Sequence, residues 1–425
     1  MAGFNHTCMT RTSEPESRTE RLPLLSLLAL ATAVFVTSLT ETLPAGLLPA
    51  ISQSLSVSES AAGQTITIYA IGTALTTIPL TVITAGWRRK RLLLLSIIGF
   101  LVANSVTAVS SNYELTMVAR FVAGMAAGVA WALLAGYARR LVPEHLQGRA
   151  IAVAMAGIPV ALAAGVPLGT FIGKEFGWRV AFWAMTVIAV ILVAWIAAFV
   201  PDFPGQGRGN RASFNRTITT PGVGAVLFVT LTFVLAHTIF YAYIASFLDS
   251  VGAGDQVDVA LLVFGLACLI SIWVVGAKID RTLRLLAITA TVLFAIAVTA
   301  LGLAGDTPIV LYSALFLWGL AWGGAPTLLQ TAVGVAGGSV ADEAQAMLVT
   351  LWNVAMAVGG VIGGLLLSGV GPNSFAWAAL IILAPTLLVI VLAKRHGFAA
   401  APKLDDAGNK DDAGNRLDAD EIHAR

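Results

Sequence analysis

Long apolar runs separated by short polar breaks make up most of this sequence. Between about residues 22 and 393 such runs recur twelve times, each with about the 20 residues that a helix needs to cross a bilayer. They span about 24–51, 62–84, 92–110, 114–138, 150–173, 179–200, 221–247, 257–277, 285–304, 308–333, 346–369 and 374–393. The pattern predicts an all-α membrane protein with twelve transmembrane helices, although Gly and Pro residues blur several helix ends.

Composition supports this interpretation and leaves no room for a soluble domain. Of 425 residues, 57% are hydrophobic and 11% charged, against roughly 25% charged in soluble proteins. The longest polar stretches are the two tails and one linker. We therefore expect five parts: an uncleaved N-terminal tail (1–21), six helices (22–200), a linker (201–220), six helices (221–393) and a tail (394–425). The last tail contains the charged near-repeat "DDAGNKDDAGNR", which favours disorder.

Basic residues gather in alternate loops. Those on one side are Arg88, Arg89, Lys90, Arg91, Arg139, Arg140, Arg149, Arg208, Arg211, Arg216, Lys278, Arg281 and Arg284. The other side has only Lys174 and Arg179, and the loop with Asp342 and Glu343 has no basic residue. Because basic loops stay in the cytoplasm, the pattern predicts a multi-pass protein of the cell membrane with both tails cytoplasmic.

The two predicted sets of six helices repeat each other. "RFVAGMAAG" at 120–128 and "LFLWGLAWG" at 315–323 share Phe, Gly and Gly at an offset of 195 residues. The same offset carries Gly165 and Gly169 onto Gly360 and Gly364. These matches predict two pseudo-symmetric six-helix bundles, joined by the Gly- and Arg-rich linker. A site between two such bundles can face either side of the membrane in turn.

Several motifs together resemble the major facilitator superfamily, in its bacterial proton-linked drug and sugar (arabinose-type) efflux branch. They are "TETLPAGLLPAI", "ARFVAGMAAGVAWAL", "GVPLGTFIG" followed by "FGWRVAFW", and "HTIFYAYIASFL", in the first, fourth, fifth and seventh helices. The resemblance implies a secondary active transporter that exports a drug, sugar or secondary metabolite by proton antiport, a function associated with multidrug resistance. A proton symporter or sugar importer of the same fold is the alternative, and a transporter-like receptor a weaker one.

Loop and helix motifs of that branch are present with one departure. The loop after the second helix, "AGWRRKR", keeps Gly86, Arg88 and Arg89 but lacks the Asp that usually follows the glycine. Its counterpart in the second half, "GAKIDRTLR", keeps Asp280 and Arg281. The fifth helix carries the antiporter-type residues Gly157, Pro159, Gly165, Pro167 and Gly169. Small residues allow close helix packing and proline bends a helix, so ordinary packing also explains this motif.

Two charged residues lie well inside predicted helices. Of the 23 acidic residues only Glu41 does so, and of the 25 basic residues only Arg120. Glu41 is about 26 Å along the first helix and Arg120 about 9 Å from the outer end of the fourth, so their depths are compatible. Because an intramembrane charge is costly, Glu41 is expected to bind the coupling proton or a cationic substrate. The alternatives are a static buried ion pair and a glutamate close enough to the surface to remain solvated. Arg120 could take part in proton coupling at Glu41, or it could have a structural role in helix packing by bonding to backbone carbonyls.

Further candidates lie on the helices that border the cavity in the resembling fold. His237 is one residue from the repeat equivalent of Glu41. It could take part in proton transfer, or it could make a fixed interhelical hydrogen bond. Tyr241, Tyr243, Trp131, Trp318, Trp322, Gln330 and Asn353 would suit an aromatic or amphipathic substrate. Trp and Tyr are also common at membrane interfaces, and cavity composition does not rank substrates.

Enzyme, metal and ATP-driven functions find no support in the sequence. It contains no GxxxxGK[ST] loop, no intramembrane Asp pair, no Ser and His dyad, and no clustering of its five His with Cys or carboxylates. Cys8 and Cys268 fall in different environments, which disfavours a disulfide. We expect a monomer without cofactors, whose partners are a small molecule, protons and the lipid bilayer, and not nucleic acid.

The basic-loop pattern gives a direct topological test. A green fluorescent protein fused after Arg425 should fluoresce and alkaline phosphatase at the same position should be inactive, because both tails are expected in the cytoplasm. Active phosphatase at that position would show that the orientation is wrong.

Overall fold

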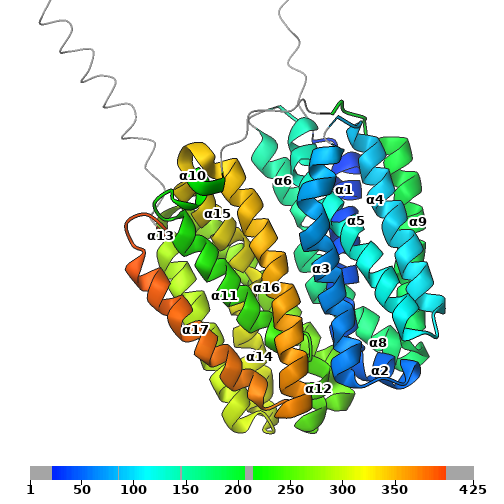
Figure 1. The fold of residues 1–425 in the computed structure, drawn as a ribbon, viewed down its shortest axis with the longest axis vertical. Coiled ribbons are helices and arrows are strands. Elements are labelled where there is room, and N and C mark those ends of the chain that lie inside the picture. Colours follow the sequence, from blue (N-terminus) through cyan, green and yellow to red (C-terminus); the bar gives the residue numbers. More distant parts are fainter. Residues whose placement is uncertain (1–21, 85, 144–145, 206–213, 399–425) are drawn as a thin grey trace, which may run out of the picture.

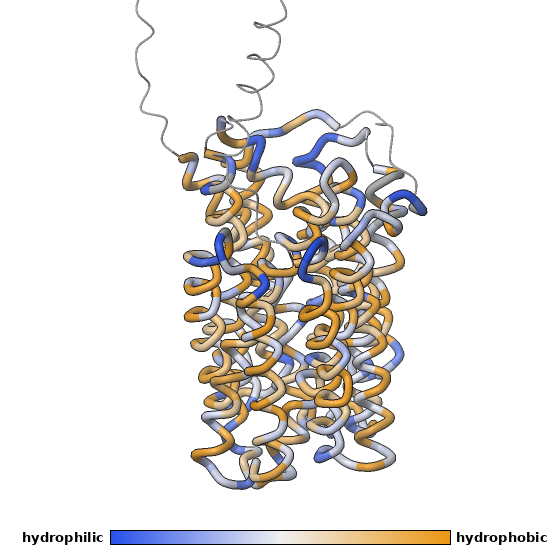
Figure 2. The backbone as a smooth tube through the Cα atoms, turned by 90° about the vertical axis from the view of Figure 1, so that its left-hand side faces the viewer, coloured by the Kyte–Doolittle hydropathy of each residue, from blue (hydrophilic) through white to orange (hydrophobic). Residues whose placement is uncertain are grey.

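The computed structural model describes residues 22–84, 86–143, 146–205 and 214–398, and the described chain is helical with short connections. This is the expected solution in hydrocarbon, where every backbone N–H and C=O needs a partner within its own segment. Figure 2 shows apolar residues along the body of the molecule, with the most hydrophilic segments mainly in its upper part. Both ends of the described chain lie on that upper side (Figure 1).

Residues up to 205 form one group of helices. They are α1 (Leu24–Gly46), α2 (Leu48–Leu55), α3 (Glu59–Ile83), α4 (Arg89–Val109), α5 (Tyr113–Arg140), α6 (Gln147–Met155), α7 (Gly157–Val160), the π-helical turn η2 (Ala161–Gly165), α8 (Val166–Phe176) and α9 (Trp178–Phe199). A second group follows from residue 214. It comprises α10 (Phe214–Ile218), α11 (Val223–Tyr241), α12 (Ile244–Ser250), η3 (Gly254–Gln256), α13 (Val257–Ala304), α14 (Pro308–Gly323), α15 (Ala325–Gly337), η4 (Gly338–Val340), α16 (Ala341–Gly369) and α17 (Ser374–Leu392).

Eleven helical segments of the described chain are long and apolar enough to cross a membrane, and they match eleven of the twelve predicted runs. The remaining run, 62–84, coincides with α3, a helix of 25 residues. Two predicted runs lie within α13, which bends at Thr282, where the backbone leaves the helical region (φ −136°, ψ 27°). The predicted segments are therefore real helices, and the prediction of an all-helical membrane protein is confirmed.

The two groups lie side by side in Figure 1 and pack mainly along two contacts, with smaller ones between α12 and both α1 and α2. In one contact α3 packs against α16, and in the other α13 packs against α7, η2 and α8. Toward the upper side, α6 packs on α1 and α5, whereas α15 packs on α11, α13 and α16. Among the described residues, neither α6 nor α15 has a substantial contact with the opposite group. Association is therefore concentrated away from the side where the described chain begins and ends.

Helix breaks recur with the offset found in the sequence. Helix α1 ends at Gly46 and α11 at Tyr241, while α2 ends at Leu55 and α12 at Ser250, so both pairs are 195 residues apart. Leu47 and Tyr243 have similar non-helical backbones, with φ of −112° and −120°. Leu47 and Tyr243 are 196 residues apart, one more than the repeat offset, so a similar bend occurs at nearly the same position of each half.

The fifth predicted helix is irregular, and its glycines face α1. Pro159 cannot donate a backbone hydrogen bond, and a π-helical turn follows it at Ala161–Gly165. A Cβ on Gly157 would overlap the Ala31 carbonyl oxygen, and one on Gly165 would lie 2.9 Å from the Phe35 ring. The opposite face of this segment contacts α13, where a Cβ on Gly265 would overlap the Leu162 carbonyl.

Gly169 and Pro167 complete this arrangement. A Cβ on Gly169 would lie 2.6 Å from Cδ1 of Leu43, a side chain of α1 that can move, whereas the contact at Gly157 is with rigid backbone. Pro167 stands in the first turn of α8, where proline is well tolerated. The glycines therefore pack the segment within the first group, and the seam with the second group is formed on its other face.

The backbone contact at Gly157 predicts an unusually costly glycine substitution. Gly157→Ala should destabilise the protein by about 1–3 kcal/mol, the usual cost of overpacking, because the Ala31 carbonyl cannot turn away. Thermal unfolding in detergent measures this. Gly136→Ala on α5 is the control, since nothing lies within 4 Å of its added Cβ. Equal melting temperatures for both variants would contradict the packing argument.

Candidate functional site

Glu41 occupies α1 five residues before the helix ends. Its side chain is half-buried, and no hydrogen bond or ion pair within the described chain reaches its carboxylate. Its charge interacts with the Arg120 guanidinium, and the side chains of Tyr69 and Tyr241 also lie within electrostatic range. Since Tyr69 belongs to α3 and Tyr241 to α11, the carboxylate is near residues of both helix groups.

Arg120 is buried and is held by backbone and ring contacts. Its side chain is 1% exposed, its Nε donates to the Thr65 carbonyl at 3.2 Å, and its guanidinium lies 4.9 Å from the centre of the Tyr69 ring. Both terminal nitrogens lack a hydrogen-bond partner. Tyr69 in turn donates to the Thr37 carbonyl at 3.2 Å, so the contacts connect α5, α3 and α1. Close backbone packing surrounds them, because a Cβ on Gly124 would overlap the Tyr69 carbonyl.

Asn104 on α4 is a buried polar residue that the sequence analysis did not single out. It is fully buried, its Nδ2 donates to Thr40 Oγ1 at 3.3 Å, and its Oδ1 has no partner. Thr40 is the neighbour of Glu41 in the chain. An amide within an apolar helix could have been noticed in the sequence, but its proximity to α1 depends on the packing of α4.

His237 is enclosed by aromatic rings. Its imidazole stacks on Trp322 with ring centroids 3.3 Å apart and planes at 5°, and on Tyr241 at 4.9 Å. Trp318 approaches edge-on at 5.3 Å. The side chain is 6% exposed, and neither His237 Nδ1 nor Trp318 Nε1 has a hydrogen-bond partner. This group, which we call the His237 cluster, also includes Phe264 and Phe294, which the sequence analysis did not identify.

The other residues expected in a substrate cavity do not form one group. Trp322 is half-buried and lies 5.4 Å from Trp352, whereas Gln330 is exposed and Trp131 is half-buried on α5. Asn353 is buried, with its Nδ2 donating to the Val349 carbonyl of its own helix at 2.9 Å. Tyr243 is fully buried and lies at the contact between α3 and α16. Of the seven candidates, the structure places Tyr241, Trp318 and Trp322 together.

No metal site is visible in the part of the chain that the structure describes. Within those residues, no three His, Cys, Asp or Glu side chains are placed to hold an ion. Cys268 is a free, buried thiol on α13, while Cys8 lies outside the described residues.

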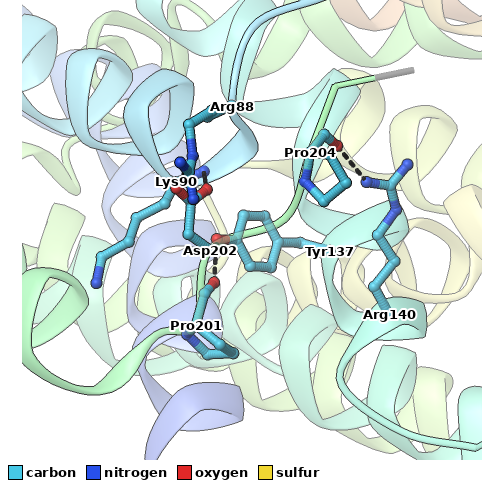
Figure 3. A network of polar contacts seen from close by, with 7 residues as sticks. All are labelled: Arg88, Lys90, Tyr137, Arg140, Pro201, Asp202 and Pro204. Carbon is cyan, nitrogen blue, oxygen red and sulfur yellow. Dashed lines mark hydrogen bonds and ion pairs between the residues drawn. The ribbon is translucent and has the colours of Figure 1, made fainter. Parts of the chain in front are cut away.

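A polar network anchors the start of the linker to the first group of helices (Figure 3). Arg88 forms an ion pair with Asp202, and the backbone N–H of Lys90 donates to the same carboxylate at 3.1 Å. Tyr137 donates to the Pro201 carbonyl at 2.7 Å, and Arg140 to the Pro204 carbonyl at 3.0 Å. The loop "AGWRRKR" lacks its usual Asp, and here a carboxylate from beyond α9 contacts its first arginine.

The remaining loop-motif residues have different surroundings. Gly86 has open space around it, and the Arg89 backbone N–H donates to the Phe203 carbonyl at 2.9 Å. Arg281 is exposed and lines a surface groove of about 280 Å³ beside Thr282. The side chain of Asp280 lies outside the described residues.

The environment of Asp202 favours its charged form. Partial desolvation acts to raise the pKa of Asp202, but the hydrogen bonds from the Lys90 N–H and the Arg88 guanidinium outweigh it, so the pKa lies below its ordinary value. The carboxylate therefore stays ionised, and the ion pair intact, across the physiological pH range.

Known proteins resemble this chain along most of its length. A family model described as Major Facilitator Superfamily matches residues 30–338. A probable sugar efflux transporter of Mannheimia succiniciproducens is 26% identical over 376 residues, covering 88% of this chain and 94% of that protein. The purine ribonucleoside efflux pump NepI of Escherichia coli K12 is 27% identical over 336 residues, covering 79% and 85%. An uncharacterized MFS-type transporter, YtbD of Bacillus subtilis, is 31% identical over 365 residues, covering 83% and 91%.

The Asp202 network predicts a pH-dependent loss of stability. Because the pKa of Asp202 is depressed on folding, the carboxylate stabilises the protein above its unfolded pKa, and this contribution is lost as the pH falls through the folded value. Asp202→Asn should lower the melting temperature slightly above about pH 5. The difference from wild type should shrink below the ordinary Asp pKa of ~3.9 and vanish once the pH is below the depressed folded pKa. Asp306→Asn, at an exposed loop, is the control. A difference that persists at low pH would contradict this.

Proposed function

Because the chain belongs to the Major Facilitator Superfamily, we propose that it is a secondary active transporter that exports a small organic molecule in exchange for protons. Membership itself makes the chain a transporter and not an enzyme, and the named efflux proteins among its relatives support the direction of transport. Proton antiport is the part of the proposal that needs an argument from the site.

The unpartnered carboxylate of Glu41 carries that argument. A charge within a membrane helix costs at least ~2.5–3.5 kcal/mol on insertion scales, and such residues usually face a bundle interior or a wet cavity. A purely structural Glu41 would be expected to form an ion pair with Arg120, yet no ion pair within 4.0 Å joins the two side chains. A half-buried carboxylate within range of a buried guanidinium is suited to gain and lose a proton as its access to water changes.

Arg120 and His237 have different places in the proposal. Arg120 is fixed by Thr65 and Tyr69, so in this proposal it acts as a stationary positive charge near Glu41. His237 is a second proton site only if water reaches its unpartnered Nδ1, because its ring is otherwise enclosed by aromatic side chains.

The helix packing supports a cycle in which two bundles rock against each other. We propose twelve spans in two six-helix bundles, 22–200 and 221–393, related by a pseudo-two-fold axis along the membrane normal. Two observations support this. The helix breaks are 195 residues apart, and the same offset relates the two contacts between the groups, because it carries α3 onto the first part of α13 and the segment of α7, η2 and α8 onto α16. With both tails cytoplasmic, the close contacts lie toward the outside, as expected for an inward-facing state.

The substrate proposal rests on the relatives and on the His237 cluster. One of these relatives is named a probable sugar efflux transporter and the other a purine ribonucleoside efflux pump, and sugars and ribonucleosides share a hydroxyl-rich ring. A cluster of aromatic rings with two unpartnered N–H-bearing side chains would bind a planar conjugated group as well. A ribonucleoside has both features, so inosine is the first probe to test and arabinose the second.

Glu41→Gln tests the proton role. The variant keeps size and hydrogen bonding but cannot titrate, so pH-driven uphill efflux of inosine or arabinose from proteoliposomes should fall at least about tenfold, while downhill counterflow should largely survive. Expression, counterflow and pH-driven efflux are measured on the same variant, with Glu114→Gln at the exposed start of α5 as the control.

Two other outcomes would contradict this role. If Glu41 only compensates the charge of Arg120, the variant leaves a buried unpaired arginine and should fold poorly, with both transport modes lost together. Intact pH-driven efflux would remove Glu41 from the mechanism.

A further inference from the structure

The contact between α3 and α16 is built around one tyrosine ring. Tyr243 stands at the break between α11 and α12 and is fully buried. A Cβ on Gly63 of α3 would overlap its Cε1 atom, and a Cβ on Gly363 of α16 would lie 2.7 Å from Cε2. The ring thus fills a slot between the two helix groups that exists because glycines line both sides.

Hydrogen bonds fix the ring in this slot. The Tyr243 hydroxyl donates to the Gly360 carbonyl at 2.9 Å and accepts from Gln64 Nε2 at 3.1 Å. Gln64 Nε2 also lies 3.3 Å from the Gly360 carbonyl, and Ser60 Oγ donates to the Gly364 carbonyl at 2.8 Å. Three of these four bonds join a residue of α3 to the second helix group.

We infer that Tyr243 is a gate residue that closes the outer end of the transport pathway, and not a substrate contact. This inference rests on the proposed function, because only an alternating-access cycle requires the slot to open. Outward opening must withdraw the ring from Gly63 and break the bonds of Gln64 and Ser60 to the second group. The polar groups of Tyr243 are satisfied in the closed slot, whereas those of His237 and Trp318 are not.

Gating by this seam is expected to be readily reversible. When the slot opens, water can replace the lost hydrogen bonds, so each bond shifts the open-to-closed ratio by only about two- to tenfold. The slot therefore excludes water while closed without locking the protein in one state.

Distance measurements between spin labels test the gate. In a Cys8→Ser, Cys268→Ala background, labels at Ser111→Cys and Asn373→Cys report the separation of the two outer ends in nanodiscs, without any substrate. Tyr243→Phe keeps the ring and removes the hydroxyl, so the ratio of long to short outer distances should rise about fivefold. Gly63→Ala should raise the ratio further, because the slot can no longer accept the ring.

Two matched controls share the chemistry but not the position. Tyr113→Phe removes a hydroxyl that donates at 2.8 Å to the Ala61 carbonyl within the first helix group, and should leave the ratio unchanged. Gly369→Ala, near the outer end of α16 with nothing within 4 Å of its added Cβ, should also leave it unchanged.

The possible results separate the gate from the proposed function. Suppose that the wild type shows two distances and exchanges inosine or arabinose in counterflow. Unchanged ratios in both Tyr243→Phe and Gly63→Ala would then overturn the gate inference and leave the proposed function standing. A wild type that shows one distance at both pH 5.5 and pH 8, and no counterflow, would contradict the proposed function. If Tyr243→Phe fails to fold, an unchanged ratio in Gly63→Ala still overturns the gate.

Discussion

A hydrocarbon environment penalises each polar group that lacks a partner, and the helices of this chain meet that constraint mainly with their own backbones. Many buried Thr and Ser hydroxyls follow the same rule by donating to a carbonyl one turn earlier, as Thr37 does to Ala33 and Thr73 to Tyr69. Glycines bring the backbones of neighbouring helices into direct contact at Gly157, Gly124 and Gly265. Once these needs are met, the polar groups that remain unpartnered stand out.

Two sets of such groups lie near the boundary between the helix groups. One contains Glu41 and the terminal nitrogens of Arg120, and the other His237 Nδ1 and Trp318 Nε1. Tyr243 differs from both because its hydroxyl donates one hydrogen bond and accepts another. With the orientation proposed above, this arrangement would correspond to a state that is closed at the outer side and open toward the cytoplasm.

The sequence predicted the helices well because hydrophobic runs and Gly or Pro breaks act locally. It did not assign the residues to faces, since residue type alone cannot say which helix a side chain meets. The sequence therefore groups Tyr243 with Trp318 and Tyr241, although the bend after α11 turns it toward α3. The contact of Asp202 with Arg88 was equally hidden, because it joins residues 114 positions apart through the packing of α4 and α9.

The central claim is that substrate and protons move in opposite directions through one carboxylate. It is tested most directly by following the lumenal pH of wild-type proteoliposomes loaded with inosine, or in parallel with arabinose, after dilution into substrate-free buffer. Antiport predicts that the lumen acidifies as the transported compound leaves, at a rate that rises with its gradient. A lumen that becomes alkaline would show symport, and efflux without any pH change would show that transport is not coupled to protons.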